Sequence, residues 1–355
     1  MGDQPILRIN ALTKRFNEFT ALHGIDLNVR DGEFLAIVGP SGSGKTTLIR
    51  LLVGMDEPTE GAIWLRDSRI DAVPANKRPT CMVFQSLALF PHRSVGQNIE
   101  FPLKLRKVAP ATRKARALEL LELLRLPASY YDKRIDECSG GEKQRVALAR
   151  ALAFDPEILF FDEPLSALDY RLRKTLEKEL KDLHRRTGKT FIYITHSLEE
   201  AMVMSDRIAI MKAGRFEQIA PAAEIYARPR SRFVAEFMGE VNLFDMVDGR
   251  VPGLRFGPRA SNLFVGQTGT LVVRPESVAL LAPGEEADVA LEGIIESEYL
   301  LGSRVQYTVA REGAAPVTVE VLRENAVGGP GAPVVMGFGT SACHLIAPEV
   351  RDAAA

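Results

Sequence analysis

A glycine-rich segment between an expected strand and an expected helix constrains the fold of this chain more than any other feature. Residues 34–38 (Phe-Leu-Ala-Ile-Val) form a continuous apolar run, which is typical of a central strand in a parallel sheet. Residues 39–47 (Gly-Pro-Ser-Gly-Ser-Gly-Lys-Thr-Thr) follow, and a helix is expected from Lys45 to about Val53, closed by Gly54. The segment matches the phosphate-binding pattern G-x-x-x-x-G-K-[ST] in the strand–loop–helix context that it requires. The sequence therefore predicts an α/β domain of the P-loop type.

The residue types of this phosphate loop suit an anion. Glycines let the backbone wrap around phosphates, and the N-terminus of the following helix adds partial positive charge. Lys45 supplies a point charge for the β and γ phosphates, and the Thr46 hydroxyl can hold Mg²⁺. The residues expected to contact the nucleotide here are Gly39, Ser41, Gly42, Ser43, Gly44, Lys45, Thr46 and Thr47. An ordinary glycine-rich turn is the alternative, and the full match in context argues against it.

Two acidic residues follow a second buried-type strand. Residues 158–162 (Ile-Leu-Phe-Phe-Asp) form an apolar run that ends in Asp162, and Glu163 comes next. Neighbouring side chains on a strand point to opposite faces, so the two carboxylates are not expected to do the same work. A solvated strand end, where acids are common, is the alternative interpretation. The phosphate loop upstream favours a catalytic pair.

A second glycine-rich turn opens a later helix. Ser139 and Glu142 fit a capping box, in which Ser139 is the N-cap and Glu142 reaches back to its N–H group. The alternative is that the box merely starts the helix that carries Val146 and Leu148. However, Gly140 and Gly141 each cost about 0.5–1 kcal/mol relative to alanine inside a helix. They are explained if the backbone must closely approach an anion at the helix N-terminus.

With this turn between the phosphate loop and the carboxylate pair, the chain resembles the ATP-binding-cassette (ABC) ATPases. The resemblance implies that the substrate is ATP with Mg²⁺, that Asp162 positions the metal shell, and that Glu163 is the general base. It also implies that Ser139, Gly140, Gly141 and Glu142 bind the γ-phosphate of ATP held by another copy of the chain. The family most often has Leu-Ser-Gly-Gly-Gln, so Cys138 and Glu142 are departures. The Glu142 side chain keeps the capping role, and Cys138 is expected to pack as a small apolar residue.

Further positions match this family in order along the chain. Gln85 matches the Q-loop glutamine that senses Mg²⁺ and the attacking water, and Asp169 ends the Ser166–Asp169 D-loop that crosses the dimer interface. His196, which precedes a second expected capping box from Ser197 to Glu200, matches the switch histidine that contacts the γ-phosphate. Taken alone, Gln85 would be a surface residue and His196 a structural one. Phe16 matches the aromatic residue that stacks on adenine; Phe19 is the competing candidate, and a core role for Phe16 stays open.

Length and charge distribution predict two domains. The chain has 355 residues, and from Val241 onward it carries eight Arg, no Lys and fourteen acids. We expect an ABC ATPase domain at 1–240, with a helical subdomain at about 88–155 and an amphipathic helix over 112–125. Beyond 240, short alternating segments such as 270–281, 293–309, 317–322 and 333–346 predict a small all-β domain, OB-like or TOBE-like, at 241–355.

Composition excludes several other classes of protein. Neither half has the concentrated basic stripe of a nucleic-acid binder. The three cysteines lack a CxxC spacing, which argues against a disulfide framework or a zinc site. No apolar run approaches 18 residues, and the start of the chain does not look like a signal peptide. The chain is therefore expected at the cytoplasmic face of the membrane, bound through a partner.

Two further resemblances point to import of a solute. Residues 84–92 (Phe-Gln-Ser-Leu-Ala-Leu-Phe-Pro-His) and 98–101 look like prokaryotic solute importers, and the apolar part of the first segment is expected at the surface as a partner site. Arg274-Pro-Glu276 and residues 299–302 resemble the β-domain of spermidine/putrescine, sulfate, iron(III) and sugar importer ATPases. Residues 236–242 and 74–78 favour the polyamine branch.

The resemblance implies a specific set of partners. They are a second copy of the chain, two transmembrane permease subunits and, indirectly, an extracytoplasmic solute-binding protein. A soluble ABC ATPase of translation or DNA repair is the rival class. The chain lacks the second cassette of the former and the long coiled-coil or zinc insertions of the latter. A purely regulatory ATP-binding protein is disfavoured by Glu163 and His196.

Overall fold

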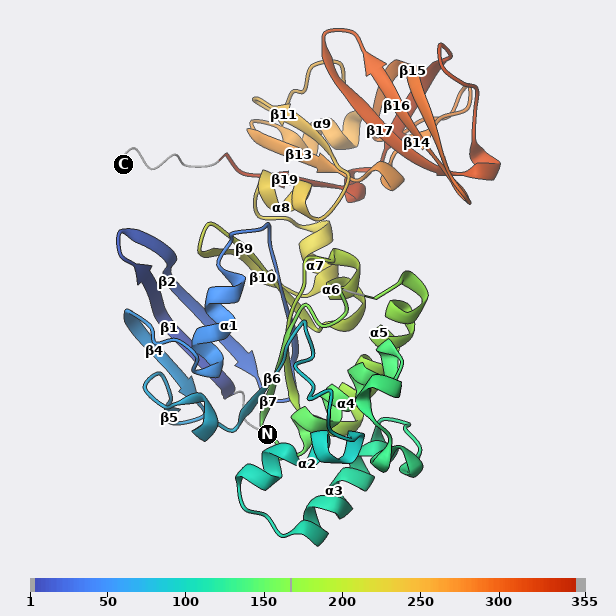
Figure 1. Ribbon diagram of the computed structural model, residues 1–355. Helices are drawn as coiled ribbons and strands as arrows, with labels where there is room; N and C mark the ends of the chain where they lie inside the picture. The colour runs from blue at the N-terminus through green and yellow to red at the C-terminus, as the bar shows by residue number, and fades with distance from the viewer. Residues whose placement is uncertain (1–3, 167, 349–355) are drawn as a thin grey trace. The chain divides into compact units, whose positions relative to one another are not determined.

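In a computed structural model of the protein, residues 4–166 and 168–348 are described, and the chain forms two compact units, Met1–Ala223 and Glu224–Ala355 (Figure 1). This division comes earlier than the boundary expected between 240 and 241. The physical reason is Arg274, a buried residue of the second unit, whose guanidinium donates to the carbonyl oxygens of Tyr226, Ala235 and Glu240 at 3.0–3.3 Å. The short helices α7 (Ala222–Ala227) and α8 (Arg232–Phe237) are thus bound to the β unit.

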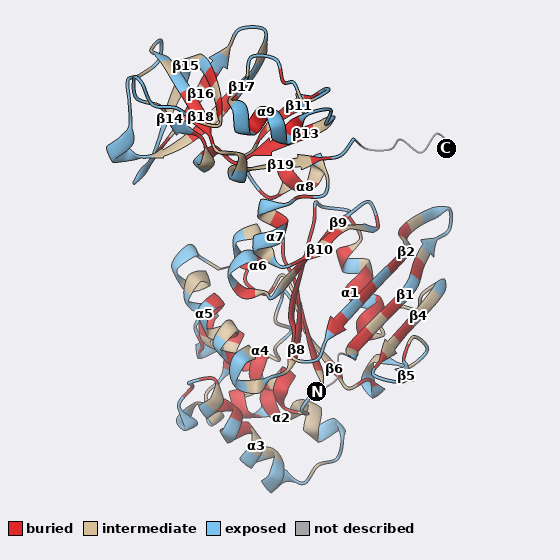
Figure 2. Cartoon of the chain, turned by 180° about the vertical axis from the view of Figure 1, so that it is seen from behind, coloured by how far each residue is buried: buried red, intermediate tan, exposed pale blue. Residues whose placement is uncertain are grey.

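The first unit is built on a six-stranded sheet in the order β10-β9-β3-β8-β7-β6. Its strands are β3 (Phe34–Val38), β6 (Thr80–Val83), β7 (Ile158–Asp162), β8 (Thr190–Ile194), β9 (Arg207–Lys212) and β10 (Arg215–Ala220). Only the β10–β9 pairing is antiparallel among these strands. The apolar runs of β3, β7 and β8 are buried, as Figure 2 shows, so the mainly parallel sheet expected from the sequence is confirmed.

A second, antiparallel sheet in the order β2-β1-β4-β5 covers helix α1 (Lys45–Val53). Its strands are β1 (Pro5–Phe16), β2 (Phe19–Arg30), β4 (Glu60–Leu65) and β5 (Ser68–Arg69). Apolar residues of both sheets and of α1, among them Leu7, Ile37 and Leu51, form one buried cluster. Buried and exposed residues alternate along much of β1 and β2, as is typical of strands with one face on the core.

The carbonyl oxygens at the C-terminus of helix α1 bind a buried arginine, Arg78. Gly54 adopts a left-handed conformation (φ 82°) after the last turn, and a Cβ atom there would lie 2.6 Å from the Arg78 Nε. The Arg78 guanidinium, which is 1% exposed, donates to the carbonyl oxygens of Leu51, Leu52, Asp71 and Val73 at 2.7–3.1 Å. A cation at a helix C-terminus is favourable because it faces the negative end of the helix dipole. Arg78 thus connects the helix of the phosphate loop to the segment that leads into β6.

Helices on the other side of the central sheet form the helical subdomain (Figure 1). They are α2 (Val95–Leu105), α3 (Pro110–Leu123) and α4 (Gly140–Leu152), and α5 (Tyr170–Thr187) and α6 (Leu198–Met204) follow along the chain. Residues such as Ile99, Leu120, Val146 and Phe161 pack into a second buried cluster. The helix expected over 112–125 starts earlier, because Pro110 is well suited to the first turn of a helix.

The second unit has two antiparallel sheets around one apolar cluster, which confirms the expected small all-β domain. The first sheet contains β11 (Asn242–Met246), β13 (Gly269–Val273) and β19 (Cys343–Ile346). The second contains β12 (Arg255–Phe256), β14 (Ala279–Leu280), β15 (Val289–Leu301), β16 (Arg304–Arg311), β17 (Ala314–Leu322) and β18 (Pro333–Phe338), and a short helix α9 (Pro258–Phe264) follows β12. The alternating segment 270–281 contains two strands, because Pro275 starts a 3-10 turn that separates β13 from β14.

Within the described ranges, no helix is both long enough and apolar enough to cross a membrane.

Candidate functional site

The phosphate loop between β3 and α1 has glycine where no other residue fits. A Cβ atom at Gly39 would lie 2.2 Å from the carbonyl oxygen of Met211. Gly42 and Gly44 have φ values of 76° and 103°, in the left-handed region that favours glycine. Gly44 is also the N-cap of α1, so the loop delivers the chain directly to a helix N-terminus. Both requirements of an anion-binding loop, a close backbone turn and a helix dipole, are therefore met.

Lys45 lies within this loop. Its Nζ atom donates to the carbonyl oxygens of Gly39 at 2.7 Å and Pro40 at 3.0 Å. Burial lowers the pKa of Lys45, while the negative charges of Glu163 and Asp162 act in the opposite direction. The loop and the carboxylate pair, far apart in the sequence, are thus electrostatically coupled.

A left-handed backbone turn follows directly after the first carboxylate of the pair. Asp162 is the last residue of β7, and Glu163 has a φ of 46° and donates its N–H group to the Ile194 carbonyl at 3.0 Å. The left-handed conformation costs about 1–3 kcal/mol for a residue with a side chain, and strain of this kind recurs at functional sites. Glu163 thus lies outside β7, so the strand alternation from which we expected different roles for the two carboxylates does not extend to it. Burial, and then the neighbouring Glu163 charge, raise the pKa of Asp162.

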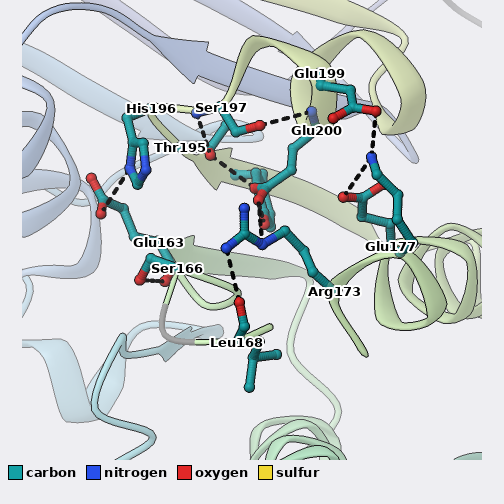
Figure 3. A network of polar contacts seen from close by, with 12 residues as sticks. Glu163, Ser166, Leu168, Arg173, Glu177, Thr195, His196, Ser197, Glu199 and Glu200 are labelled. Atoms are coloured by element: carbon teal, nitrogen blue, oxygen red, sulfur yellow. Dashed lines mark hydrogen bonds and ion pairs between the residues drawn. The ribbon is translucent and has the colours of Figure 1, made fainter. Parts of the chain in front are cut away.

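Glu163 faces the expected switch histidine (Figure 3). The Nδ1 atom of His196 lies 3.2 Å from the Oε2 atom of Glu163. The His196 side chain is 63% exposed and the Glu163 side chain 28% exposed. A structural role in the core is thereby excluded for His196, and both groups are accessible to a substrate.

The Q-loop and the D-loop contact each other next to Glu163. Gln85, which follows β6, donates from Nε2 to the Ser166 hydroxyl at 3.0 Å. Ser166 in turn donates to the Glu163 carbonyl oxygen at 2.9 Å. Asp169 is the exposed N-cap of α5 and accepts from the Leu172 N–H group at 3.1 Å. Of the D-loop residues, Ala167 lies outside the described residues.

The turn from Ser139 to Glu142 is the capping box that the sequence predicted, and we call it the signature turn. Ser139 donates its N–H group to the Glu142 carboxylate at 2.7 Å, and the Glu142 N–H group donates to the Ser139 hydroxyl at 3.3 Å. The same carboxylate accepts from the Tyr130 hydroxyl at 2.8 Å and from the Lys133 ammonium at 3.3 Å. These donors, the Ser139 N–H group first, lower the pKa of Glu142 to about 2. Sequence patterns did not indicate Tyr130, which lies in a short 3-10 helix (Ala128–Asp132), or Lys133, which directly follows this helix.

The two glycines of the signature turn differ in what surrounds them. A Cβ atom at Gly141 would lie 3.0 Å from the Leu172 side chain, which is a tight contact. At Gly140 the nearest atom would be 3.7 Å away, which is ordinary van der Waals distance, and the residue is exposed. Packing within the chain therefore explains glycine at 141 and does not explain it at 140. Cys138 is buried, its thiol lies 3.4 Å from the Arg134 carbonyl, and burial raises its pKa, which fits the expected packing role.

Phe16 lies at the end of β1, opposite Phe19 across a tight turn. Its side chain is half-exposed, and the Lys14 ammonium lies 5.0 Å from its ring centroid. The core role left open for Phe16 is therefore excluded. Phe19 is exposed as well, so both aromatic rings stay candidates for stacking on a base.

The segment after Gln85 is less open than the sequence suggested. Leu87 and Leu89 pack against the core of the helical subdomain, which corrects the expectation of an exposed apolar run. Leu87 and Ala88 have positive φ values (60° and 48°), and the Arg150 guanidinium donates to both carbonyl oxygens at 2.6 Å. The buried Asn98 binds the Phe90 backbone at 2.8 and 3.1 Å. The segment is thus a fixed surface that leaves Ala88, Pro91 and His92 exposed.

The helix after His196 departs from its expected cap. Ser197 accepts from the Glu200 N–H group at 3.2 Å, which is one half of a capping box. The Glu200 carboxylate does not return to the Ser197 N–H group. It accepts instead from the hydroxyls of Tyr193 and Thr195, both at 2.8 Å.

Comparisons with known proteins agree with this geometry. A family model described as ABC transporter matches residues 22–166, and one described as TOBE domain matches residues 271–346. A spermidine/putrescine import ATP-binding protein of Roseobacter denitrificans is 42% identical, with 94% of this chain and 96% of that protein covered. A protein of the same description from Rubrobacter xylanophilus is 39% identical, with 97% and 94% covered.

Solved structures resemble the first unit. A bacterial ABC transporter cassette bound to ADP and phosphate in a dimeric post-hydrolysis state is 32% identical, with a TM-score of 0.53, and the match covers 61% of this chain and 98% of that one. A Clostridium perfringens cassette from an ABC transporter complex is 29% identical, with a TM-score of 0.59 and coverage of 63% and 92%.

Proposed function

The chain belongs to the ABC transporter family of ATP-binding proteins, and on that premise we propose that it is the ATPase of a bacterial polyamine importer. That it is an importer ATPase follows from its family. The choice of polyamine rests on one observation: relatives that align over nearly the whole chain, C-terminal unit included, are described as spermidine/putrescine import proteins. The expected sulfate, iron(III) and sugar branches have no comparable support.

ATP binds along the phosphate loop in this proposal. The loop N–H groups and Lys45 hold the phosphates, and Phe16 or Phe19 stacks on the base. The residues present fit Mg²⁺ as well: an unfavourable environment raises the pKa of Asp162, so a cation beside this carboxylate would be stabilised. Thr46, Gln85 and Asp162 would hold the ion through hydroxyl, amide and carboxylate oxygens. When bound, Mg²⁺ supplies charge neutralisation at the β and γ phosphates.

Glu163 is proposed as the general base. Its carboxylate takes a proton from the water that attacks the γ-phosphorus, a type of assistance typically worth about 10²–10⁴ in rate. His196 Nδ1, at 3.2 Å, orients the carboxylate, and the imidazole is exposed enough to contact the γ-phosphate. Gln85 is held through Ser166 at the edge of the same site, where it can orient the water.

The active site is completed by a second copy of the chain. Gly140 is exposed and open, and α4 presents its N-terminal N–H groups beside it. These features suit the γ-phosphate of ATP held by the other copy. Asp169, exposed at the start of α5, belongs to the D-loop that is expected to cross between the copies. The dimeric cassette structures support this arrangement.

Closure of the dimer would drive two permease subunits at the cytoplasmic face of the membrane. The fixed segment from Ser86 to His92 is the proposed docking surface, because Arg150 and Asn98 hold its backbone while part of it stays exposed. A solute-binding protein would deliver the polyamine to the permeases. No nucleic acid is involved.

Uptake in cells tests the proposed function. Cells that depend on this chain should accumulate labelled spermidine or putrescine, and a Lys45→Ala variant should abolish uptake. Sulfate, ferric iron and maltose serve as comparison solutes in the same cells. Uptake of one of these in place of polyamines would contradict the proposed substrate and leave the ATPase assignment intact.

A further inference from the structure

A buried glutamate controls the backbone on both sides of the switch histidine. Glu200, which is 3% exposed, accepts hydrogen bonds from the hydroxyls of Tyr193 and Thr195. Figure 3 shows its carboxylate pointing from α6 toward the end of β8. Tyr193 lies on β8 and Thr195 directly follows this strand, so Glu200 holds both the end of the strand and the residue before His196.

The residue after the histidine is tied to the same group. The Ser197 N–H group donates to the Thr195 hydroxyl at 2.9 Å, and the Glu200 N–H group donates to the Ser197 hydroxyl. His196 is therefore the middle residue of a three-residue turn whose two outer members are both bonded into the Glu200 network. Displacement of Glu200 would rotate the His196 side chain relative to Glu163.

A guanidinium connects this network to the D-loop. Arg173, in the first turn of α5, donates from Nη2 to the Leu168 carbonyl at 2.9 Å. Its Nε atom lies 3.9 Å from the Glu200 Oε1 atom, too far for a hydrogen bond. This Nε–H group is buried and has no hydrogen-bond acceptor in the structure. A buried donor without an acceptor costs free energy, so a small shift that completes its bond to Glu200 would be favoured.

We propose that Arg173 and Glu200 are a pair of positioning residues that couples the D-loop to the switch histidine. Movement of the D-loop carries Arg173 toward Glu200, and the completed bond holds the Thr195–Ser197 turn so that His196 faces Glu163. The inference rests on the proposed function, because the D-loop is expected to move when two copies meet around ATP. Hydrolysis would thereby depend on contact with the second copy.

A simple packing role for the pair is the competing explanation, and a neighbouring ion-pair group provides the control. Lys174 bridges the same two helices, with its ammonium 2.9 Å from Glu177 on α5 and 2.7 Å from Glu199 on α6. Among the residues that the structure describes, this bridge bonds neither to the D-loop nor to Thr195. If Arg173 and Glu200 mattered only because they hold α5 against α6, loss of the ion pair between Lys174 and Glu199 should lower kcat as much as loss of Glu200.

The test is steady-state ATP hydrolysis by the purified full-length chain. Glu200→Gln and Arg173→Met should each lower kcat about tenfold, as loss of positioning of a catalytic group does, with the KM for ATP within about twofold of wild type. Glu199→Gln should keep wild-type kcat. The double variant Arg173→Met/Glu200→Gln should be no slower than the slower single variant, because the two residues act through each other.

The melting temperatures of the same variants show whether a lower kcat comes from impaired catalysis or from loss of folded protein. Should Glu200→Gln fail to fold, Arg173→Lys serves in its place: a single ammonium cannot bond the Leu168 carbonyl and Glu200 together, so kcat should still fall. Wild-type kcat in the Arg173 and Glu200 variants, or an equal loss in Glu199→Gln, would overturn the coupling. Absence of ATP turnover in the wild-type chain would instead contradict the proposed function.

Discussion

The imidazole Nδ1 atom of His196 and the carboxylate Oε2 atom of Glu163 lie 3.2 Å apart, although the two residues follow different strands. Glu163 reaches this position through a left-handed backbone conformation, and His196 through the turn that Thr195 and Ser197 hold. The contact places a proton acceptor beside a group that can orient it.

Replacement of the proposed base should separate ATP binding from hydrolysis. Glu163→Gln keeps the size of the side chain and removes the proton acceptor, so turnover should fall by about 10²–10⁴ while ATP still binds. The variant should also accumulate as an ATP-dependent dimer, measurable by light scattering. A Glu163→Gln chain that stays monomeric at saturating ATP, alone and with its permeases, would refute the shared active site.

The two glycines of the signature turn should respond differently to alanine. Gly140→Ala should leave the melting temperature unchanged or raise it, because alanine favours a helix by about 0.5–1 kcal/mol and no atom crowds the site. It should nevertheless abolish ATP-dependent dimerisation, since the added methyl group would face the nucleotide of the other copy.

Gly141→Ala is the matched comparison. Its Cβ atom would press on Leu172 at 3.0 Å, and overpacking of this kind typically costs about 1–3 kcal/mol. We expect a lower melting temperature than for Gly140→Ala. If Gly140→Ala forms the ATP-dependent dimer normally, the main structural argument that Gly140 faces the γ-phosphate of the other copy's ATP is lost.

The contribution of Lys133 to the ATP-dependent dimer should depend on the glutamate at position 142. Its ammonium offsets a carboxylate that lies in the proposed phosphate-facing turn, so Lys133→Met should weaken the ATP-dependent dimer a few-fold. Glu142→Gln removes the charge, and in that background Lys133→Met should have no further effect. Equal losses in both backgrounds, measured by ATP titration, would assign Lys133 a role unrelated to Glu142.

Stability should depend on pH through Glu142. Its pKa is lowered from 4.5 to about 2, so the folded state favours the ionised form. The stabilisation is fully present above about pH 4.5 and is lost as the pH falls toward 2. In urea unfolding, the advantage of wild type over Glu142→Gln should thus be constant near neutral pH and shrink on acidification. An advantage that grows on acidification would contradict the assigned bonds.

Arg78 should be a large contributor to the stability of the first unit. Arg78→Met would remove the guanidinium donor from four carbonyl oxygens, of which Leu51 keeps a second donor in the Gly54 N–H group, at a cost of about 2–4 kcal/mol by denaturant unfolding. The control is Arg50→Met, also at the end of α1: its side chain is half-exposed and paired with Asp56, so it should cost less than about 1 kcal/mol. Similar losses in both variants would refute the helix-end role of Arg78.

Local chemistry made part of this molecule predictable from sequence. Helix α1 begins and ends at Lys45 and Val53 as expected, because a phosphate loop and a left-handed glycine define both ends within a few residues. The capping box at Ser139 was predictable for the same reason. Contacts between distant segments were not: nothing near Glu142 in sequence indicates Tyr130, and nothing near His196 indicates Arg173. Alternation also could not reveal that Pro275 interrupts an apparent strand.

The bonds of Arg274 bear on how the C-terminal unit could be exchanged between related proteins. A junction placed at residue 240, where the sequence pattern changes, would separate this buried guanidinium from the native carbonyls of Tyr226, Ala235 and Glu240. A junction before Glu224 would transfer the cation together with its acceptors. Helix α8 and the part of α7 from Glu224 onward therefore belong with the β unit. A hybrid transporter ATPase would have to take both from the protein that supplies its C-terminal half.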